Sequence, residues 1–415
     1  MNGRRVVITG TGVVSALGMS RAELFENLLN GRSAIRRMEE WGLNLNGGFS
    51  PGAPVVLGDA AKKKIPRLFR RSMGDLSIFA SLAAMQALEE SGLEPEAVSG
   101  GRCGCVIGST MGSSKSIAEA FRMILLEHGM ADMPAAQFFK CASHTASFNV
   151  ANLLNITGCV QSASAACASG LQAVGTARSL IAYGAQDIMI CGGADELSQE
   201  VTGSFDLLYA GASEYENAPE CSSRPFDARR TGLVCGEGAG ILVMEELEHA
   251  KARGAKIYAE IVGYGATSDA HHVTAPLEDG SGAAKAMEFA MKDAGVTPEE
   301  IDYVNAHGTG THLNDLTETA ALKLAMGEAA YHCKVNSTKS MVGHLLGAAG
   351  GVEAIACVKA IQENYVHKNA GLVNRDPECD LDCVTEAVET PVNVAMSNSL
   401  GFGGHNATLI FKAYE

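Results

Sequence analysis

The chain has 415 residues, 47% of them hydrophobic and 19% charged, so it can bury a large core and is neither disordered nor a coiled coil. Its net charge of −15 argues against nucleic acid as a partner, because phosphate binding depends on Lys and Arg. No stretch approaches ~18 uninterrupted apolar residues, so we expect no membrane segment. Twelve cysteines without an export signal predict reduced thiols and a cytoplasmic location.

Strands and helices alternate along the first half of the sequence, as expected of an α/β protein. Short apolar runs bounded by glycine predict strands, and apolar residues at helical spacing predict helices. Cys103 and Cys105 alternate on one strand and would point to the same face, which indicates packing. The expected strands are 6–10, 103–110, 187–193 and 239–247, the last two paired with each other, and the expected helices are 21–30 and 76–91.

Cys167 lies where the small-residue run QSASAACASG (161–170) passes into a helix expected over 170–183. A thiol at a helix start has unpaired backbone N–H groups and the positive end of the helix dipole beside it, and both favour the thiolate. The small neighbours leave room for a substrate to reach the sulfur. Taken alone, this stretch fits a nucleophile and a buried packing cysteine equally well.

Two local patterns resemble ligand sites without completing them. GTGVVS (10–15) follows a strand like a dinucleotide-binding loop, but Ser15 stands at the third glycine position and no acidic residue follows at the required distance, so we expect a structural turn. Cys141 and His144 have the look of a metal pair, yet no further ligands follow at a recognisable spacing. We therefore expect neither a metal nor a cofactor.

From about residue 257 the order of elements repeats. This duplication predicts two similar α/β units, 1–250 and 251–415, packed in layers α-β-α-β-α, with one helix of each unit between two sheets. The elements expected in the second unit are a strand from 257, a helix over 281–294, a strand at 301–305 with its loop to 311, a loop and helix within 334–363, and a strand pair within 393–412.

Polar residues of the second half gather at expected strand ends, where the functional groups of parallel α/β sheets collect. His307 follows a strand in NAHGTGT, and His344 lies in STKSMVGHLLGAAG, five residues after Lys339. The turn SLGFGGHN (399–406) has glycines that allow its N–H groups to point into a site. Together with the N–H of Cys167 it predicts an oxyanion hole, with Phe402 either at its lip or in the core.

These segments resemble the thiolase-like condensing enzymes, and most of all the elongating 3-oxoacyl-[acyl-carrier-protein] synthases, over essentially the whole chain. The resemblance implies a duplicated thiolase-like fold and an acyltransferase that condenses an acyl chain held on Cys167 with malonyl-[acyl-carrier-protein] in fatty acid elongation, releasing CO2. The motifs that carry it are VVITGTGVVSALG, SAACASG, RPFDARRTGLVCGEGAG, AHHVTAP, NAHGTGT, STKSMVGHLLGAAGG and SNSLGFGGHN.

The resemblance also implies roles for individual residues. Cys167 corresponds by position to the family nucleophile, and His307 and His344 to the two histidines that assist decarboxylation. Phe402 corresponds to the gating phenylalanine, whose N–H contributes to the oxyanion hole. The other matching positions are Lys339, near His307, and the supporting acidic residues Asp315 and Glu318.

The run KKKIPRLFRR (62–71) concentrates positive charge in an acidic chain. It fits a solvated helix face or a docking patch for an acidic partner. The resemblance implies that this partner is acyl carrier protein, and that the enzyme is a homodimer or pairs with a sister chain. The docking residues would be Lys63, Lys64, Arg67, Arg70 and Arg71.

Differences within the superfamily favour an active elongating synthase. The C-terminal glycine turn lacks the second cysteine of thiolases, His344 stands where initiating synthases use asparagine, and Cys167 is present, unlike in chain-length-controlling subunits. Three departures from the family pattern, Thr231, His312 and Leu400, concern the shape of the acyl pocket. The alternatives are therefore a ketosynthase of an aryl-polyene or type II polyketide pathway and, outside catalysis, a partner subunit that shapes a pocket.

Overall fold

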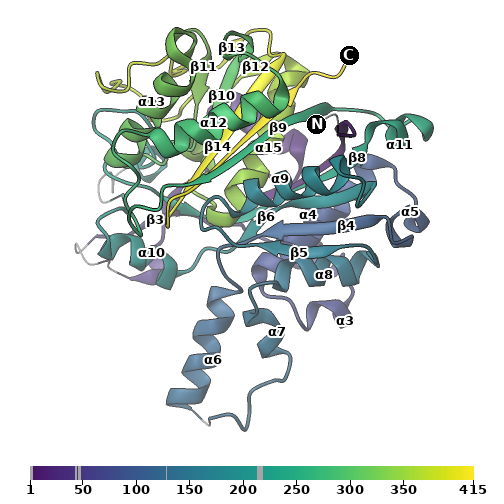
Figure 1. Cartoon of the computed structure of the whole chain (residues 1–415). Coiled ribbons are helices and arrows are strands. Elements are labelled where there is room, and N and C mark those ends of the chain that lie inside the picture. The colour runs from purple at the N-terminus through teal and green to yellow at the C-terminus, as the bar shows by residue number, and fades with distance from the viewer. Residues whose placement is uncertain (1–2, 43, 45–47, 128, 213–217) are drawn as a thin grey trace.

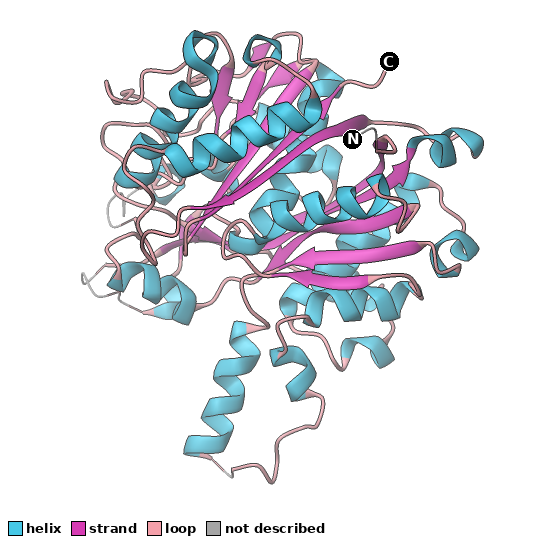
Figure 2. Ribbon diagram, in the orientation of Figure 1, coloured by secondary structure: helices cyan, strands magenta, loops and turns pink. Residues whose placement is uncertain are grey.

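The computed structural model describes residues 3–42, 44, 48–127, 129–212 and 218–415. Ten strands form one mixed sheet, flanked by helices (Figure 2). Its first half contains β1 (Val6–Ser15), β4 (Cys103–Gly108), β5 (Val160–Ala163), β6 (Ile188–Asp195) and β8 (Gly238–Glu246). Its second half contains β9 (Ala259–Ser268), β10 (Tyr303–Asn305), β11 (Lys334–Asn336), β14 (Val394–Gly401) and β15 (His405–Lys412).

Helices of different lengths and several short strands accompany the ten-stranded sheet. The larger helices are α4 (Asp75–Ser91), α8 (Thr145–Leu154), α9 (Ser169–Ala182), α12 (Ser281–Ala294), α13 (His312–Met326) and α15 (Ala349–Glu363). The others are α1 (Arg21–Leu29), α2 (Asp59–Lys63), α3 (Arg67–Arg70), α5 (Pro95–Ser99), α6 (Ser114–Leu126), α7 (Gln137–Cys141), α10 (Gln199–Leu207), α11 (Leu247–Ala252) and α14 (Lys339–Val342). Short strands are β2 (Arg36–Arg37), β3 (Pro51–Ala53), β7 (Cys235–Gly236), β12 (Tyr365–Val366) and β13 (Val388–Glu389).

The strand order is the same in both halves of the sheet. It runs β5-β4-β6-β8-β1 in the first half and β11-β10-β14-β15-β9 in the second, with the same parallel and antiparallel pairings. The two halves meet where β1 pairs with β9 through Val7–Glu260 and Ile8–Ala259. The predicted duplication is confirmed, although the two expected sheets are joined at one edge by hydrogen bonds.

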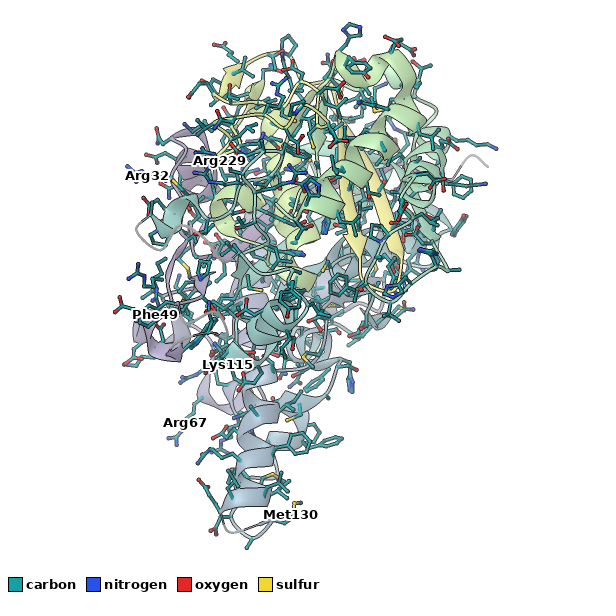
Figure 3. All side chains as sticks on the ribbon, turned by 90° about the vertical axis from the view of Figure 1, so that its left-hand side faces the viewer. Arg32, Phe49, Arg67, Lys115, Met130 and Arg229 are labelled. Atoms are coloured by element: carbon teal, nitrogen blue, oxygen red, sulfur yellow. The ribbon has the colours of Figure 1, made fainter. Side chains whose placement is uncertain are left out.

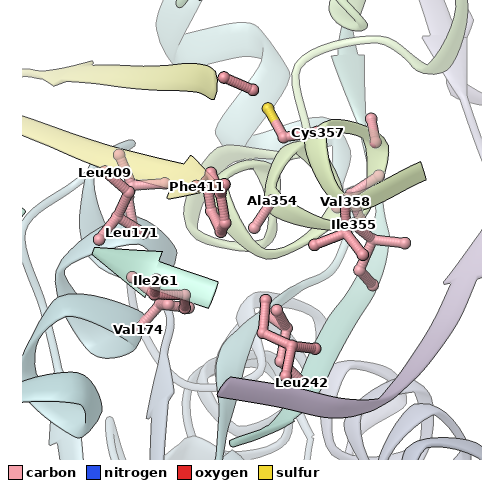
Figure 4. Close-up of a cluster of buried hydrophobic side chains, with 14 of the residues drawn as sticks. Leu171, Val174, Leu242, Ile261, Ala354, Ile355, Cys357, Val358, Leu409 and Phe411 are labelled. Carbon is pink, nitrogen blue, oxygen red and sulfur yellow. The ribbon is translucent and has the colours of Figure 1, made fainter. Parts of the chain in front are cut away.

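Three apolar clusters separate the layers. The first packs α4 and α8 against one face of the first half-sheet, and the second packs α12 and α13 against the outer face of the second half-sheet. The third lies between the half-sheets and includes α9 and α15 (Figures 1 and 4). This arrangement confirms the α-β-α-β-α prediction. Among the described residues, no helix is both long and apolar enough to cross a membrane.

Strands between two helix layers are apolar on both faces, as β6 shows. Ile188 and Ile190 face the α4–α8 cluster, whereas Met189 and Cys191 face the central one. This alternation explains why the strand has no polar period. Cys103 and Cys105 of β4 both lie in the α4–α8 cluster, which confirms their predicted packing role.

The segment GTGVVS is part of β1, so the prediction of a turn there is wrong. Its glycines serve close packing, because a Cβ at Gly10 would lie 2.1 Å from the carbonyl oxygen of Ala87, and one at Gly12 would lie 1.9 Å from that of Ala83. Both carbonyls belong to α4. The glycine pattern thus reflects close packing of α4 on β1, and it does not form a dinucleotide-binding loop.

Glycines also bring the two central helices together near their first turns. A Cβ at Gly170 would lie 2.5 Å from the carbonyl oxygen of Gly347, and one at Gly350 would lie 2.5 Å from the amide nitrogen of Leu171 in α9. Larger side chains would therefore separate α9 from the segment that leads into α15. This close contact, predicted from the Gly and Ala content, places the two helix starts beside one another.

Candidate functional site

Side chains from both halves converge at one end of the central layer. The Sγ atom of Cys167 and a ring nitrogen of each of His307 and His344 lie within 4.8 Å of one another, and all three residues are buried. They line a cavity of about 420 Å³. The structure thus brings together the three residues expected to form the reaction centre.

Cys167 follows β5 and precedes α9 in a tight turn. Ala166 has a left-handed backbone with φ of +49°, which is uncommon for a residue other than glycine. The Ser169 hydroxyl fixes this turn, since its Oγ accepts a hydrogen bond from the N–H of Ala165 (2.8 Å) and donates one to the carbonyl of Ala166 (2.6 Å). The turn places the thiol just before the N-terminus of α9, which begins at Ser169.

The glycine turn after β14 lies against this cysteine. A Cβ at Gly401 would be 2.6 Å from the carbonyl oxygen of Ala165 and 3.3 Å from the amide nitrogen of Cys167. The backbone N–H groups of Cys167 and Phe402 both interact with the thiol sulfur. An oxyanion hole requires two such donors, and the predicted hole at Cys167 and Phe402 stays a prediction. The Phe402 ring is partly buried and packs against Phe205, with 5.7 Å between ring centroids.

Burial raises the pKa of the Cys167 thiol to about 12, and the negative charge of Asp195 acts in the same direction. The ammonium of Lys339 and the two backbone N–H groups lower the pKa, but their effect is smaller than that of burial. The backbone N–H groups thus favour the thiolate, as expected from the sequence, but burial outweighs them and the pKa of the thiol lies above its usual range. The sequence indicates the helix start, but it does not show the burial that raises the pKa of the thiol.

His344 lies between α14 and the short 3-10 helix Leu346–Ala348, not directly at a strand end as expected. The N–H of Leu346 points to its Nδ1 at 3.3 Å, so this nitrogen is the acceptor and the ring proton resides on Nε2. Burial and the charge of Lys339 lower the pKa of His344 well below its usual range. His344 is thus a neutral imidazole with one N–H to donate.

His307 lies two residues beyond β10, as predicted. Its ring is nearly perpendicular to that of His344, with 5.2 Å between the centroids. Its backbone N–H and that of Gly308 each donate to the Glu318 carboxylate at 2.7 Å. Burial, Lys339 and His344 lower the pKa of His307 well below its usual range, so it is neutral as well.

Lys339 is buried beside the two imidazoles and forms an ion pair with Glu353 of α15. Glu353 was not predicted, although a single acidic residue in the apolar run GGVEAIACV was a usable signal. The ammonium and the Nε2 proton of His344 favour an anion in the site. The cysteine and two histidines have a metal-like spacing, but this neighbouring positive charge opposes a cation.

Asp315 and Glu318 are both buried in α13 and do not line the cavity. Glu318 holds the backbone of His307, and burial raises its pKa to about 7. Asp315 accepts a hydrogen bond from the N–H of Phe226 (2.8 Å) and lies 3.4 Å from the guanidinium of Arg230. Their places agree with a supporting network.

The three departures from the family pattern line the cavity. His312 is the first residue of α13, and its Nδ1 lies 3.1 Å from the guanidinium of Arg230. Thr231 and Leu400 line the same cavity. The shape and polarity of the cavity are therefore set partly by residues that distinguish this chain.

The basic run lies on α2, α3 and their ends, outside the cavity. Figure 3 shows Arg67 projecting outward from the surface. Among the described residues, no carboxylate forms an ion pair with any predicted docking residue of this run. Lys63, Lys64, Arg67 and Arg71 are exposed, and Arg70 is half-buried.

Comparison with known proteins gives one consistent set of matches. Residues 3–250 match the family model described as beta-ketoacyl synthase, N-terminal domain, and residues 258–373 match the C-terminal domain. The 3-oxoacyl-[acyl-carrier-protein] synthase 2 of Synechocystis sp. is 41% identical over 99% of both chains.

Two solved structures cover both chains completely. One is a type II PKS acyl-carrier protein in complex with its ketosynthase bound to the hexaketide (33% identity, TM-score 0.91). The other is the ishigamide ketosynthase/chain length factor (35% identity, TM-score 0.92).

Proposed function

Because the chain belongs to the beta-ketoacyl synthase family, we propose that it condenses an acyl chain carried on Cys167 with malonyl-[acyl-carrier-protein]. The products are 3-oxoacyl-[acyl-carrier-protein] and CO2, as in fatty acid elongation. The observation that carries this proposal is the buried thiol within 4.8 Å of two neutral imidazoles. A partner subunit that only shaped a pocket would need none of these groups.

The first step is transfer of the acyl group. The Cys167 sulfur attacks the thioester carbonyl, and the N–H groups of Cys167 and Phe402 bind the oxyanion that forms. The bond from carbonyl carbon to the carrier's sulfur then breaks. The thiol proton lost from Cys167 ends on the carrier thiol.

The second step makes a carbanion without a strong base. The bond between the malonyl carboxylate and its methylene breaks, CO2 leaves, and the electron pair moves to the thioester oxygen as an enolate. N–H donors of His307 and His344 stabilise that oxygen, and the nearby ammonium of Lys339 adds a favourable charge. Neutral imidazoles suit this role because they donate a hydrogen bond without protonating the carbanion.

The third step joins the two carbons. The enolate carbon attacks the acyl-cysteine carbonyl, the oxyanion again occupies the pair of N–H groups, and Cys167 leaves as a thiolate that takes up a proton. On this reading, residues 1–250 supply the nucleophile and 251–415 supply the histidines. The first half would thus carry the electrophilic acyl group, and the second half would stabilise the enolate that attacks it.

The decisive experiment supplies the purified enzyme with malonyl-carrier protein and one acyl-carrier protein at a time. Saturated chains should give CO2 and 3-oxoacyl product in equal amounts. A rate confined to unsaturated or aromatic starters would instead favour the aryl-polyene or polyketide alternative, which the cavity positions of Thr231, His312 and Leu400 support. The absence of product with every starter would refute the proposed function.

We propose that acyl carrier protein docks on the basic run. Charge reversal at Arg67→Glu with Arg71→Glu should raise KM for malonyl-carrier protein about tenfold at low salt, a change of ~1.4 kcal/mol. The rate with malonyl-pantetheine should not change, because it lacks the protein. Steady-state kinetics with both substrates measure this. Lys292→Glu, an exposed reversal on α12, is the control. Equal effects of the two changes on KM would exclude specific docking.

We propose that the enzyme is a homodimer, and two surfaces support this. β5 is the terminal strand of the sheet and is largely exposed. α6 and α7 belong to an arm, 114–127 and 129–141, that extends from the layers (Figure 1). The apolar side chains exposed on this arm include Phe121, Leu125, Leu126, Met130 and Phe138.

A dimer interface at the arm predicts that Leu125→Glu with Phe138→Glu gives a monomer, because charged groups would have to be buried. Sedimentation velocity should give twice the chain's mass for the unmodified protein. Leu324→Glu, an exposed change on α13, should leave the dimer intact. A monomer that assembles only with a second ketosynthase-like chain would favour the heterodimer instead.

The twelve cysteines are free thiols, which supports a cytoplasmic location.

A further inference from the structure

Asp195 is a buried carboxylate at the end of β6 that neither the sequence analysis nor the three chemical steps employ. Its side chain contacts both halves of the chain, at Thr110 and at Gly347. One oxygen, Oδ2, accepts three hydrogen bonds. The backbone N–H of Thr110 donates at 3.0 Å, the Thr110 hydroxyl at 2.8 Å and the backbone N–H of Gly347 at 2.9 Å. A single oxygen therefore ties the loop after β4 to the segment that follows His344.

Gly347 belongs to the turn that fixes the His344 ring. The preceding residue, Leu346, has a left-handed backbone with φ of +51°, and its N–H points to Nδ1 of His344. There is no free space at Gly347, because a Cβ there would lie 2.8 Å from Asp195 Oδ2 and 2.7 Å from the Cα of Ser109. An uncommon backbone conformation persists only where its surroundings hold it, and the Asp195 carboxylate is one of those surroundings.

We propose that Asp195 is a positioning residue for decarboxylation: through Gly347 it holds the Leu346 amide against Nδ1 of His344 and so keeps the Nε2 proton directed at the enolate oxygen. This inference rests on the proposed condensation. Asp195 itself touches neither substrate nor sulfur. Its effect on decarboxylation runs through the orientation and tautomer of His344.

The position of Asp195 near Cys167 gives this role a distinctive signature. Its negative charge disfavours the Cys167 thiolate, whereas its hydrogen bond to Gly347 supports His344. Removing the carboxylate should therefore speed reactions of the thiol and slow decarboxylation. A carboxylate that only stabilised the fold would slow both when removed. The two readouts thus separate positioning from general structural support.

The neighbouring residue Glu196 provides a matched control. It is equally buried, but its carboxylate accepts hydrogen bonds from the Ser113 hydroxyl (2.9 Å) and the N–H of Lys115 (2.8 Å) at the start of α6. None of its hydrogen bonds reaches the turn that contains Gly347. Glu196→Gln should leave both readouts within twofold of the unmodified enzyme.

The test compares Asp195→Ala and Asp195→Asn at pH 8. We expect Asp195→Ala to lower malonyl-carrier protein decarboxylation at least tenfold while iodoacetamide alkylation of Cys167 becomes several-fold faster. Asp195→Asn retains an oxygen for Gly347, so it should recover much of the decarboxylation while alkylation stays fast. A parallel fall of both rates in Asp195→Ala, or unchanged decarboxylation, would overturn the inference.

If Asp195→Ala does not fold, nitrogen-15 NMR of labelled histidine in Asp195→Ser decides the question, because the shorter side chain withdraws its oxygen from the Gly347 N–H. A mixture of His344 tautomers supports the inference, and an unchanged Nε2–H tautomer overturns it. An unmodified enzyme without decarboxylation would refute the proposed function instead, so the two failures are distinguishable.

Discussion

Cys167→Ala should abolish acyl transfer and lower condensation on the order of 10⁴-fold, because no other group can carry the acyl chain. The cavity supports this expectation, since Cys167 is the cysteine that lines it beside the two imidazoles. Intact-protein mass spectrometry after incubation with acyl-carrier protein measures the loss directly. The unmodified chain should gain one acyl group, and the variant none.

Two further variants make this result specific. Cys167→Gln should lose condensation but retain decarboxylation of malonyl-carrier protein, because the imidazoles and Lys339 remain. Cys235→Ala removes another buried thiol of the same apolar cluster and should leave acylation intact. Stoichiometric acyl transfer to Cys167→Ala would disprove the assignment of the nucleophile.

His307→Ala and His344→Ala should each lower decarboxylation roughly 10²–10³-fold, the usual effect of removing one preorganised donor to a developing oxyanion. Acylation should change far less, because the donors to that oxyanion are backbone N–H groups of Cys167 and Phe402. Release of CO2 from malonyl-carrier protein and acylation by mass spectrometry measure the two steps separately.

Conservative changes sharpen the histidine prediction. His344→Asn retains an N–H donor in a smaller side chain and should keep more decarboxylation than His344→Ala. His332→Ala alters an exposed histidine and serves as the control. An undiminished condensation rate in either alanine variant of the pair would contradict its proposed role.

Much of the fold was predictable because its rules are local. The helix over 281–294 was predicted at its observed ends, since Gly280 and Gly295 flank it with left-handed backbones and its apolar spacing is regular. The duplicated strand order followed from repeated element order. The prediction for GTGVVS was wrong because its glycines allow α4 to pack closely on β1, and the local sequence does not show this contact.

The site was predictable as a set of residues but not as an electrostatic environment. Motifs identified Cys167, His307 and His344, and the structure brings them together. The pKa of the thiol depends on its burial, and the neutrality of the imidazoles depends on burial and on Lys339. The hydrogen bond from Gly347 to Asp195 joins residues 152 positions apart, and no sequence spacing indicates such a contact.

The central apolar layer also determines how the protein must fold. Leu171 and Val174 of α9 share one cluster with Ile355 and Val358 of α15 (Figure 4), so neither half has a complete core by itself. A chain ending near residue 250 would expose one face of α9 to water. We therefore expect the two halves to unfold together in one cooperative transition, and the site between them to be lost only when the whole molecule unfolds.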